Sequence, residues 1–232
     1  MGPGRVEELL RDGILLKEKK DFGQAAALFT TAIIRSEEIG YPHGILHGLF
    51  NIGEIWKLKA REKGSRTFAR LSHLNALEAL DYAKEKSMPS EEITHAKFLL
   101  GQAEFELGNF SEAVALYQEA YDFYQEHPRS TAHTGDIQRH LGTAMIRAGK
   151  VDNGIAIIQS GLAAIRTFDE RDAFDKRNYV WETGALLALA DAYSQTDTQK
   201  AQQFAQEALN IAQEKDLIIR KEEATRKLSN LG

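Results

Sequence analysis

A small residue recurs along this 232-residue chain in a repeated context, and this recurrence constrains the fold more than any other feature. It follows a mostly apolar stretch, as in Phe98-Leu99-Leu100-Gly101. The recurring residues are Gly13, Gly53, Gly101, Gly142, Ala190 and Gly232, which are separated by 40, 48, 41, 48 and 42 residues. Self-similarity at such a period is typical of arrays of supersecondary units. We therefore expect about five similar units that stack to complete a shared core.

A second small residue follows the first within most units. The second residues are Ala25, Ala113, Gly154 and Ala201, at distances of 12, 12, 12 and 11 residues. Small residues at two facing positions predict two antiparallel helices in close contact, joined by turns such as Gly108-Asn109 and Gly149-Lys150. In the second unit two registers stay open, one on Ala76 and Ala83 and the other on Ala69 and Ala76.

The composition agrees with a helical chain and excludes several classes of function. Only 4 Pro residues are present, and 43% of the residues are hydrophobic, as in an ordinary globular chain. Cys is absent, which excludes disulfides and thiolate chemistry. The net charge of −5, with acidic and basic residues interspersed, argues against broad nucleic-acid binding. Without a secretory signal or a membrane-spanning apolar run, we expect a cytoplasmic protein that binds no membrane.

This pattern resembles the tetratricopeptide repeat (TPR) family, best over residues 95–124. The residues that carry the resemblance are Leu100-Gly101, Leu107-Gly108-Asn109-Phe110, Ala113, Tyr117 and Ala120. The common repeat has 34 residues, whereas this one has 40–48, like the long repeats of kinesin light chains and bacterial peptide-sensing regulators. Gly154 and Gly161 depart from the usual alanines. The resemblance implies an all-α fold, an α-solenoid coiled as a right-handed superhelix, with a capping helix at the C-terminal end.

The expected helices are paired in five units within one domain, residues 1–232. We predict units at 5–39, 43–86, 90–126, 130–168 and 173–214, then a terminal helix at 217–230. Their helices are expected at 5–19 and 22–39, 43–63 and 66–86, 90–107 and 110–126, 130–148 and 151–168, and 173–195 and 198–214. Two charged runs, 57–66 and 168–177, are expected to be solvated loops or helix ends.

The sequence contains no recognisable catalytic motif. The phosphate-binding, dinucleotide-binding, nucleophile-elbow and HExxH patterns are all absent. His43 and His47 have a spacing that can place two ligands on one helix face, but no carboxylate or Cys close in the sequence completes a ligand set. We therefore expect no enzyme, no metal and no cofactor.

The resemblance implies that the first helix of each unit, helix A, lines a concave groove that contacts ligands. Cations, an Asn and exposed aromatics in that groove would suit a peptide with acidic and apolar groups. The candidate lining residues are Arg11, Lys17, His47, Phe50, Asn51, Glu54, Lys57, His95, Phe98, Gln102, Arg139, His140, Thr143, Arg147 and Asp191.

The sequence thus predicts a non-enzymatic interaction module that holds a peptide segment of a partner protein. Two alternatives stay open. One is a self-assembling scaffold, in which a second copy covers apolar residues of the terminal helix (Leu217, Ile218, Leu228 and Leu231). The other is the sensory domain of a regulator that binds a short peptide or small effector.

Overall fold

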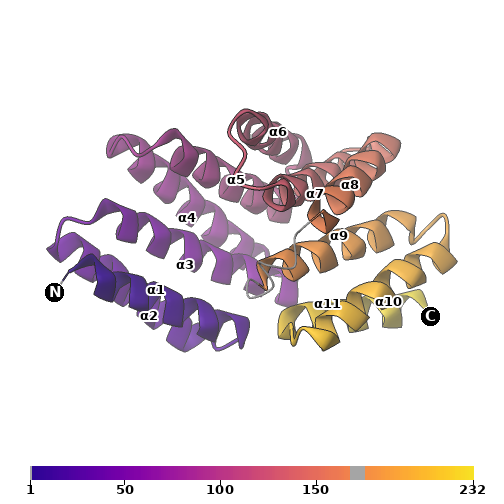
Figure 1. Cartoon of the computed structure of the whole chain (residues 1–232), viewed down its shortest axis with the longest axis horizontal. Helices are drawn as coiled ribbons and strands as arrows, with labels where there is room; N and C mark the ends of the chain where they lie inside the picture. The colour runs from indigo at the N-terminus through magenta and orange to yellow at the C-terminus, as the bar shows by residue number, and fades with distance from the viewer. Residues whose placement is uncertain (1, 168–175) are drawn as a thin grey trace. The chain divides into compact units, whose positions relative to one another are not determined.

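The computed structural model describes residues 2–167 and 176–232, and within these ranges it contains eleven helices and no strand (Figure 1). The helices are α1 (Pro3–Glu18), α2 (Phe22–Glu38), α3 (Pro42–Lys63), α4 (Arg66–Glu85), α5 (Ser90–Leu107), α6 (Phe110–Glu126), α7 (Thr131–Arg147), α8 (Val151–Arg166), α9 (Arg177–Tyr193), α10 (Thr198–Glu214) and α11 (Ile218–Leu231). The predicted all-α helical-repeat fold is confirmed. No helix in the described ranges is both long enough and apolar enough to cross a membrane.

The predicted helices and the observed ones agree closely wherever the structure describes them. Eight of them match to within one residue at each end, namely 22–38, 42–63, 66–85, 90–107, 110–126, 131–147, 198–214 and 218–231. Two predicted bounds lie outside the described residues, namely the end of α8 at 168 and the start of α9 at 173. Most of the charged run 168–177 lies outside them as well. The other run, 57–66, is a helix end, because α3 continues through Lys63.

The chain consists of two compact units, residues 1–116 and 117–232, and the boundary falls within α6. We call these two the first unit and the second unit, and we call each predicted helix pair a repeat. Each unit has its own buried core. The organisation of residues 1–232 as a single domain stays a prediction.

Helix ends carry the expected turn chemistry. Asp21 and Asp197 accept hydrogen bonds from Gln24 N and Lys200 N, which caps the starts of α2 and α10. Gly108 ends α5 in the left-handed region at φ 89°, where a residue with a side chain would be strained. The next residue, Asn109, donates its side-chain amide to Glu104 Oε2 at 2.6 Å. The Gly-Asn turn therefore reverses the chain between α5 and α6.

The predicted small residues lie at the closest helix contacts. Ala25 and Ala32 of α2 are fully buried, and a Cβ on Gly13 of α1 would lie 2.5 Å from the ring of Phe29. In α3, a Cβ on Gly53 would lie 2.7 Å from Asn75 Oδ1 of α4. The small residue on helix A thus makes room for a side chain of helix B.

The pair α7 and α8 is packed even more closely, backbone against backbone. A Cβ on Gly142 would lie 2.5 Å from the carbonyl oxygen of Gly154, and a Cβ on Gly154 would lie 2.5 Å from that of Gly142. Gly135 and Gly161 face each other in the same way. The two glycines that depart from the repeat pattern therefore have a steric reason, since each faces another glycine across the helix pair.

The terminal helix α11 packs on α9 and α10 through part of its apolar face. Leu217 and Ala224 are buried, whereas Ile218 is 41% exposed. The expectation that Leu217 is exposed is wrong, because Leu217 is only 7% exposed and its backbone N–H donates to the Ala212 carbonyl of α10 at 2.8 Å. Leu228 and Leu231 are half-buried.

We predict that Gly142→Ala lowers the free energy of unfolding by about 1–3 kcal/mol, because the new methyl group meets a backbone carbonyl that cannot rotate away. The matched control is Gly23→Ala in α2, where a Cβ has only Asp21 Oδ1 near it, at 4.0 Å. That substitution is expected to be neutral or to add up to about 1 kcal/mol. Chemical denaturation measures both values. Equal effects of the two substitutions would contradict the close approach of α7 and α8.

Candidate partner-binding surface

Two neighbouring A helices of the first unit, α3 and α5, face each other through side chains at a constant offset of 45 residues. His47 lies 3.4 Å from Glu92 Oε1, Lys57 Nζ donates to Gln102 Oε1 at 2.5 Å, and Arg61 Nε donates to Glu106 Oε1 at 2.5 Å. Phe50 and His95, also 45 residues apart, have ring centroids 4.8 Å apart. We call these four pairs the α3–α5 ladder.

Aromatic and imidazole rings form a continuous row beside one end of the ladder. Their successive centroid distances are 5.9, 4.1, 5.5, 4.8 and 6.2 Å, along Tyr41, His43, His47, Phe50, His95 and Phe98. Phe50 and Phe98 are only 6% and 7% exposed. The expectation of exposed aromatics at these two positions is therefore wrong. Phe50 is buried in a cluster that joins α3 to α4 and α5 and includes Leu46, Ala76 and Leu100.

An ion pair between a buried lysine and a half-buried glutamate lies within the ladder. Lys57 is 5% exposed and its Nζ lies 2.5 Å from Glu54 Oε2, one turn earlier in α3. Burial alone would raise the pKa of Glu54, but the charges of Lys57, Lys17 and Arg61 outweigh it and lower that pKa to about 2. Because the pKa lies below its ordinary value, Glu54 stabilises the fold above about pH 4.5, and this contribution is lost as the pH falls toward 2. Lys17 of α1 is thereby coupled to α3.

At the end of the ladder formed by His47, within the row of rings, Glu92 faces two histidines of α3. Its Oε1 lies 3.4 Å from His47 Nε2 and 3.5 Å from His43 Nδ1. The hydrogen bond with His47 lowers the pKa of Glu92, and burial acts in the opposite direction. No carboxylate lies close to His43 and His47 in the sequence, but in the structure α5 brings Glu92 next to both of them.

The candidate residues of the second unit are largely committed to contacts inside it. Arg139 donates from Nε and one terminal nitrogen to Asp136 Oδ1, at 2.9 and 2.7 Å, and also contacts His140. Arg139 Nε would lie 3.2 Å from a Cβ on Gly184 of α9, which is again 45 residues further along. Both Arg139 and His140 are buried. The Thr143 hydroxyl donates to the Arg139 carbonyl, and Asp191 pairs with Lys227.

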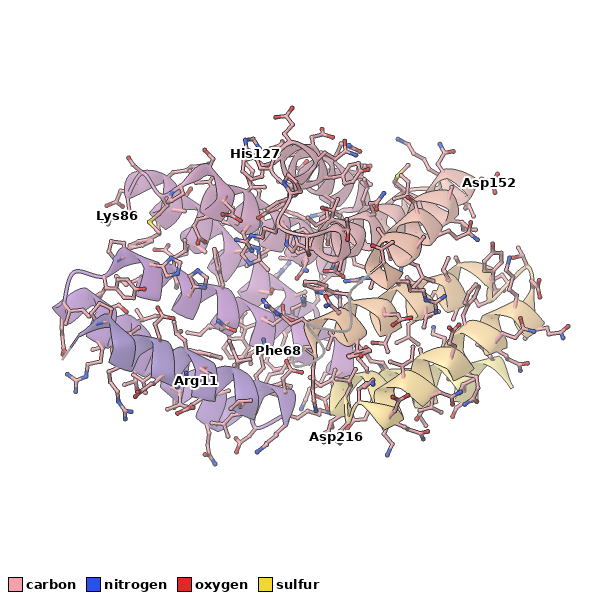
Figure 2. All side chains as sticks on the ribbon, in the orientation of Figure 1. Arg11, Phe68, Lys86, His127, Asp152 and Asp216 are labelled. Carbon is pink, nitrogen blue, oxygen red and sulfur yellow. The ribbon has the colours of Figure 1, made fainter. Side chains whose placement is uncertain are left out.

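Accessibility divides the fifteen candidate residues into three groups. Arg11, Arg147 and Asp191 are exposed, and Figure 2 labels Arg11 on α1. The half-buried residues are Lys17, His47, Asn51, Glu54, His95 and Thr143. The buried ones are Phe50, Lys57, Phe98, Gln102, Arg139 and His140. The exposed and half-buried residues can therefore contact a partner directly, while the buried residues can only hold these accessible side chains in position.

The fifteen candidate lining residues leave out three residues that shape this surface, namely Arg61, Glu92 and Glu106, while His43 is singled out only for its spacing from His47. The 45-residue offset is a signal that could have found them. Two pairs of suitable polarity, 47 with 92 and 61 with 106, stand at that separation.

Comparison with known proteins places this fold in a recognised class. No protein-family model matches the chain, and none of the curated proteins matches it. Among solved structures, a Rap protein complexed with Competence and Sporulation Factor is similar at 13% identity and a TM-score of 0.63, over 98% of this chain and 63% of that one. The TPR-like repeats of a putative kinesin light chain from Podosopora anserina match at 15% identity and a TM-score of 0.58, over 91% and 97% of the two chains. BtubC (BKLC) from P. vanneervenii matches at 14% identity and a TM-score of 0.57, over 89% and 87%.

The helix pairs and these neighbours define the chain as an all-α helical-repeat protein. Its repeats are TPR-like, as the sequence resemblance predicts. At this level of identity the likeness extends to the fold alone.

We predict that Lys57→Met raises the pKa of Glu54 from about 2 toward its ordinary value of 4.5, because the nearest cation is lost. Removing one partner of a buried pair also costs about 3 kcal/mol of stability. Carboxyl-detected NMR titration measures the pKa, and urea denaturation measures the stability. The control is Lys59→Met on the same helix, since the Lys59 ammonium lies over the Trp56 ring instead. A Glu54 carboxyl that still titrates near 2 in Lys57→Met would contradict the assignment.

Proposed function

We propose that this chain is a non-enzymatic interaction scaffold that holds a protein segment against the A helices α1, α3 and α5. The observation that carries the proposal is the α3–α5 ladder, coupled to α1 through Lys17 and Glu54. It orders a mixed row of imidazoles, carboxylates and cations before any partner arrives. Pre-ordered side chains cost less entropy when a partner binds, which favours recognition.

The chemistry of the accessible residues fits a polypeptide partner. Arg11 is exposed and Lys17 is half-buried, so both cations can reach a carboxylate. Asn51 Nδ2 donates to the His47 carbonyl at 2.9 Å, which holds its amide plane in one orientation. An amide held in this way can pair with a peptide backbone. Lys57 and Arg139, which are buried in ion pairs, act as positioning residues in this proposal.

The fold neighbours support the same class of function. The Rap protein was solved in complex with Competence and Sporulation Factor, so a protein with a similar fold binds a factor. By this analogy the partner of the present chain is a protein segment. Self-assembly of the chain and sensing of a small effector are the competing functions.

We predict that short random peptides selected by phage display on this protein lose at least tenfold in affinity for an Arg11→Ala, Lys17→Ala, Asn51→Ala variant. Tenfold corresponds to about 1.4 kcal/mol of binding free energy. Fluorescence polarisation with the selected peptides measures the affinity.

The matched control removes two cations and an amide from the exposed side of the B helices α2 and α4, as Gln24→Ala, Arg70→Ala and Lys84→Ala. It should bind the selected peptides like the wild type. Equal affinity of the wild type and the α1–α3 variant, or a loss confined to the control, would reject the proposed surface.

A further inference from the structure

Three side chains of the first unit converge at the junction of α3 and α5 in a way that suits a metal ion. His43 and His47 lie four residues apart on α3, so both rings project from the same face of the helix. Glu92 comes from the first turn of α5. One ligand atom from each residue lies within 4.8 Å of the other two.

The distances between these atoms differ from those of good hydrogen bonds. Glu92 Oε1 is 3.5 Å from His43 Nδ1 and 3.4 Å from His47 Nε2, and both values exceed the usual range for a charged N–H···O contact. Two atoms that each lie about 2.1 Å from a tetrahedral metal are about 3.4 Å apart. The two separations from Glu92 Oε1 therefore correspond to two edges of a coordination tetrahedron.

The burial of the three side chains also suits a metal site. The Glu92 side chain is only 12% exposed, whereas those of His43 and His47 are 41% and 34% exposed. The carboxylate is thus held by the fold, and the imidazoles leave a path from solvent. Two imidazoles with one carboxylate match borderline divalent metals, above all Zn²⁺, better than Mg²⁺ or Ca²⁺, which prefer all-oxygen sites.

We infer that His43, His47 and Glu92 bind a Zn²⁺ ion that ties α3 to α5. This goes beyond the proposed scaffold function and does not depend on it. Three protein ligands leave at least one coordination position for water or for a donor from a bound segment. The ion would join two successive repeats at the end of the α3–α5 ladder formed by His47 and Glu92.

We predict that isothermal titration of the chelator-treated full chain with ZnCl₂ detects one saturable site. We expect His43→Ala, His47→Ala and Glu92→Gln each to weaken it at least tenfold, because each removes one of three ligands. The matched control is His73→Gln. His73 forms a separate pair with Glu104, at an ordinary hydrogen-bond distance of 2.8 Å and with no second histidine. That variant should keep the wild-type affinity.

A second measurement needs no variant and so does not depend on the folding of any substitution. Addition of ZnCl₂ to the wild-type chain should shift the imidazole NMR resonances of His43 and His47 and leave those of His73 and His127 unchanged. The inference is overturned if the wild type shows no saturable Zn²⁺ binding. It is equally overturned if the affinity is the same after all three ligand substitutions, or if the shifts occur at other histidines.

Discussion

The structure depends on the close approach of the two helices within each repeat. Where a Cβ would stand on Gly13, Gly53 or Gly142, an atom of the partner helix already lies within 2.7 Å. Dense packing of this kind tolerates no added volume, since protein interiors have few voids that could absorb it. The small residues therefore determine how near helix B can come, and the larger apolar residues around them complete the core.

The approach of successive A helices in the first unit explains why polar residues are buried there. When α3 and α5 meet, their facing side chains must find partners in each other, because a buried polar group without a partner is costly. Lys57 with Glu54 and Gln102, and Arg61 with Glu106, meet this requirement. The surface that remains accessible is then ordered by the same contacts that join the repeats.

The helices and their pairing could be predicted from the sequence because their signals are local. Gly108 ends α5, Asp197 caps α10, and the spacing of Gly13, Ala25 and Ala32 sets one close helix contact, all within a few turns of chain. Even the close contact of Gly142 with Gly154 leaves a trace in the sequence, because Gly154 departs from the usual alanine. Its reason becomes clear only when the two backbones are seen in contact.

The functional surface was less predictable because its properties arise between repeats. Whether Phe50 is exposed depends on how closely α5 approaches α3, and no local pattern carries that distance. Glu92 joins His43 and His47 across a gap of more than forty residues, so a search for ligands nearby in the sequence could not find it. The register between successive A helices is the missing quantity, and in the first unit it is 45 residues.

A crystal structure of this protein with a selected peptide tests the account most directly, because it locates the partner without any substitution. We expect the peptide to lie along α1, α3 and α5, in contact with Lys17 and Asn51 and above the α3–α5 ladder. A peptide bound instead to the B helices α2 and α4, with the A helices left bare, would contradict the account.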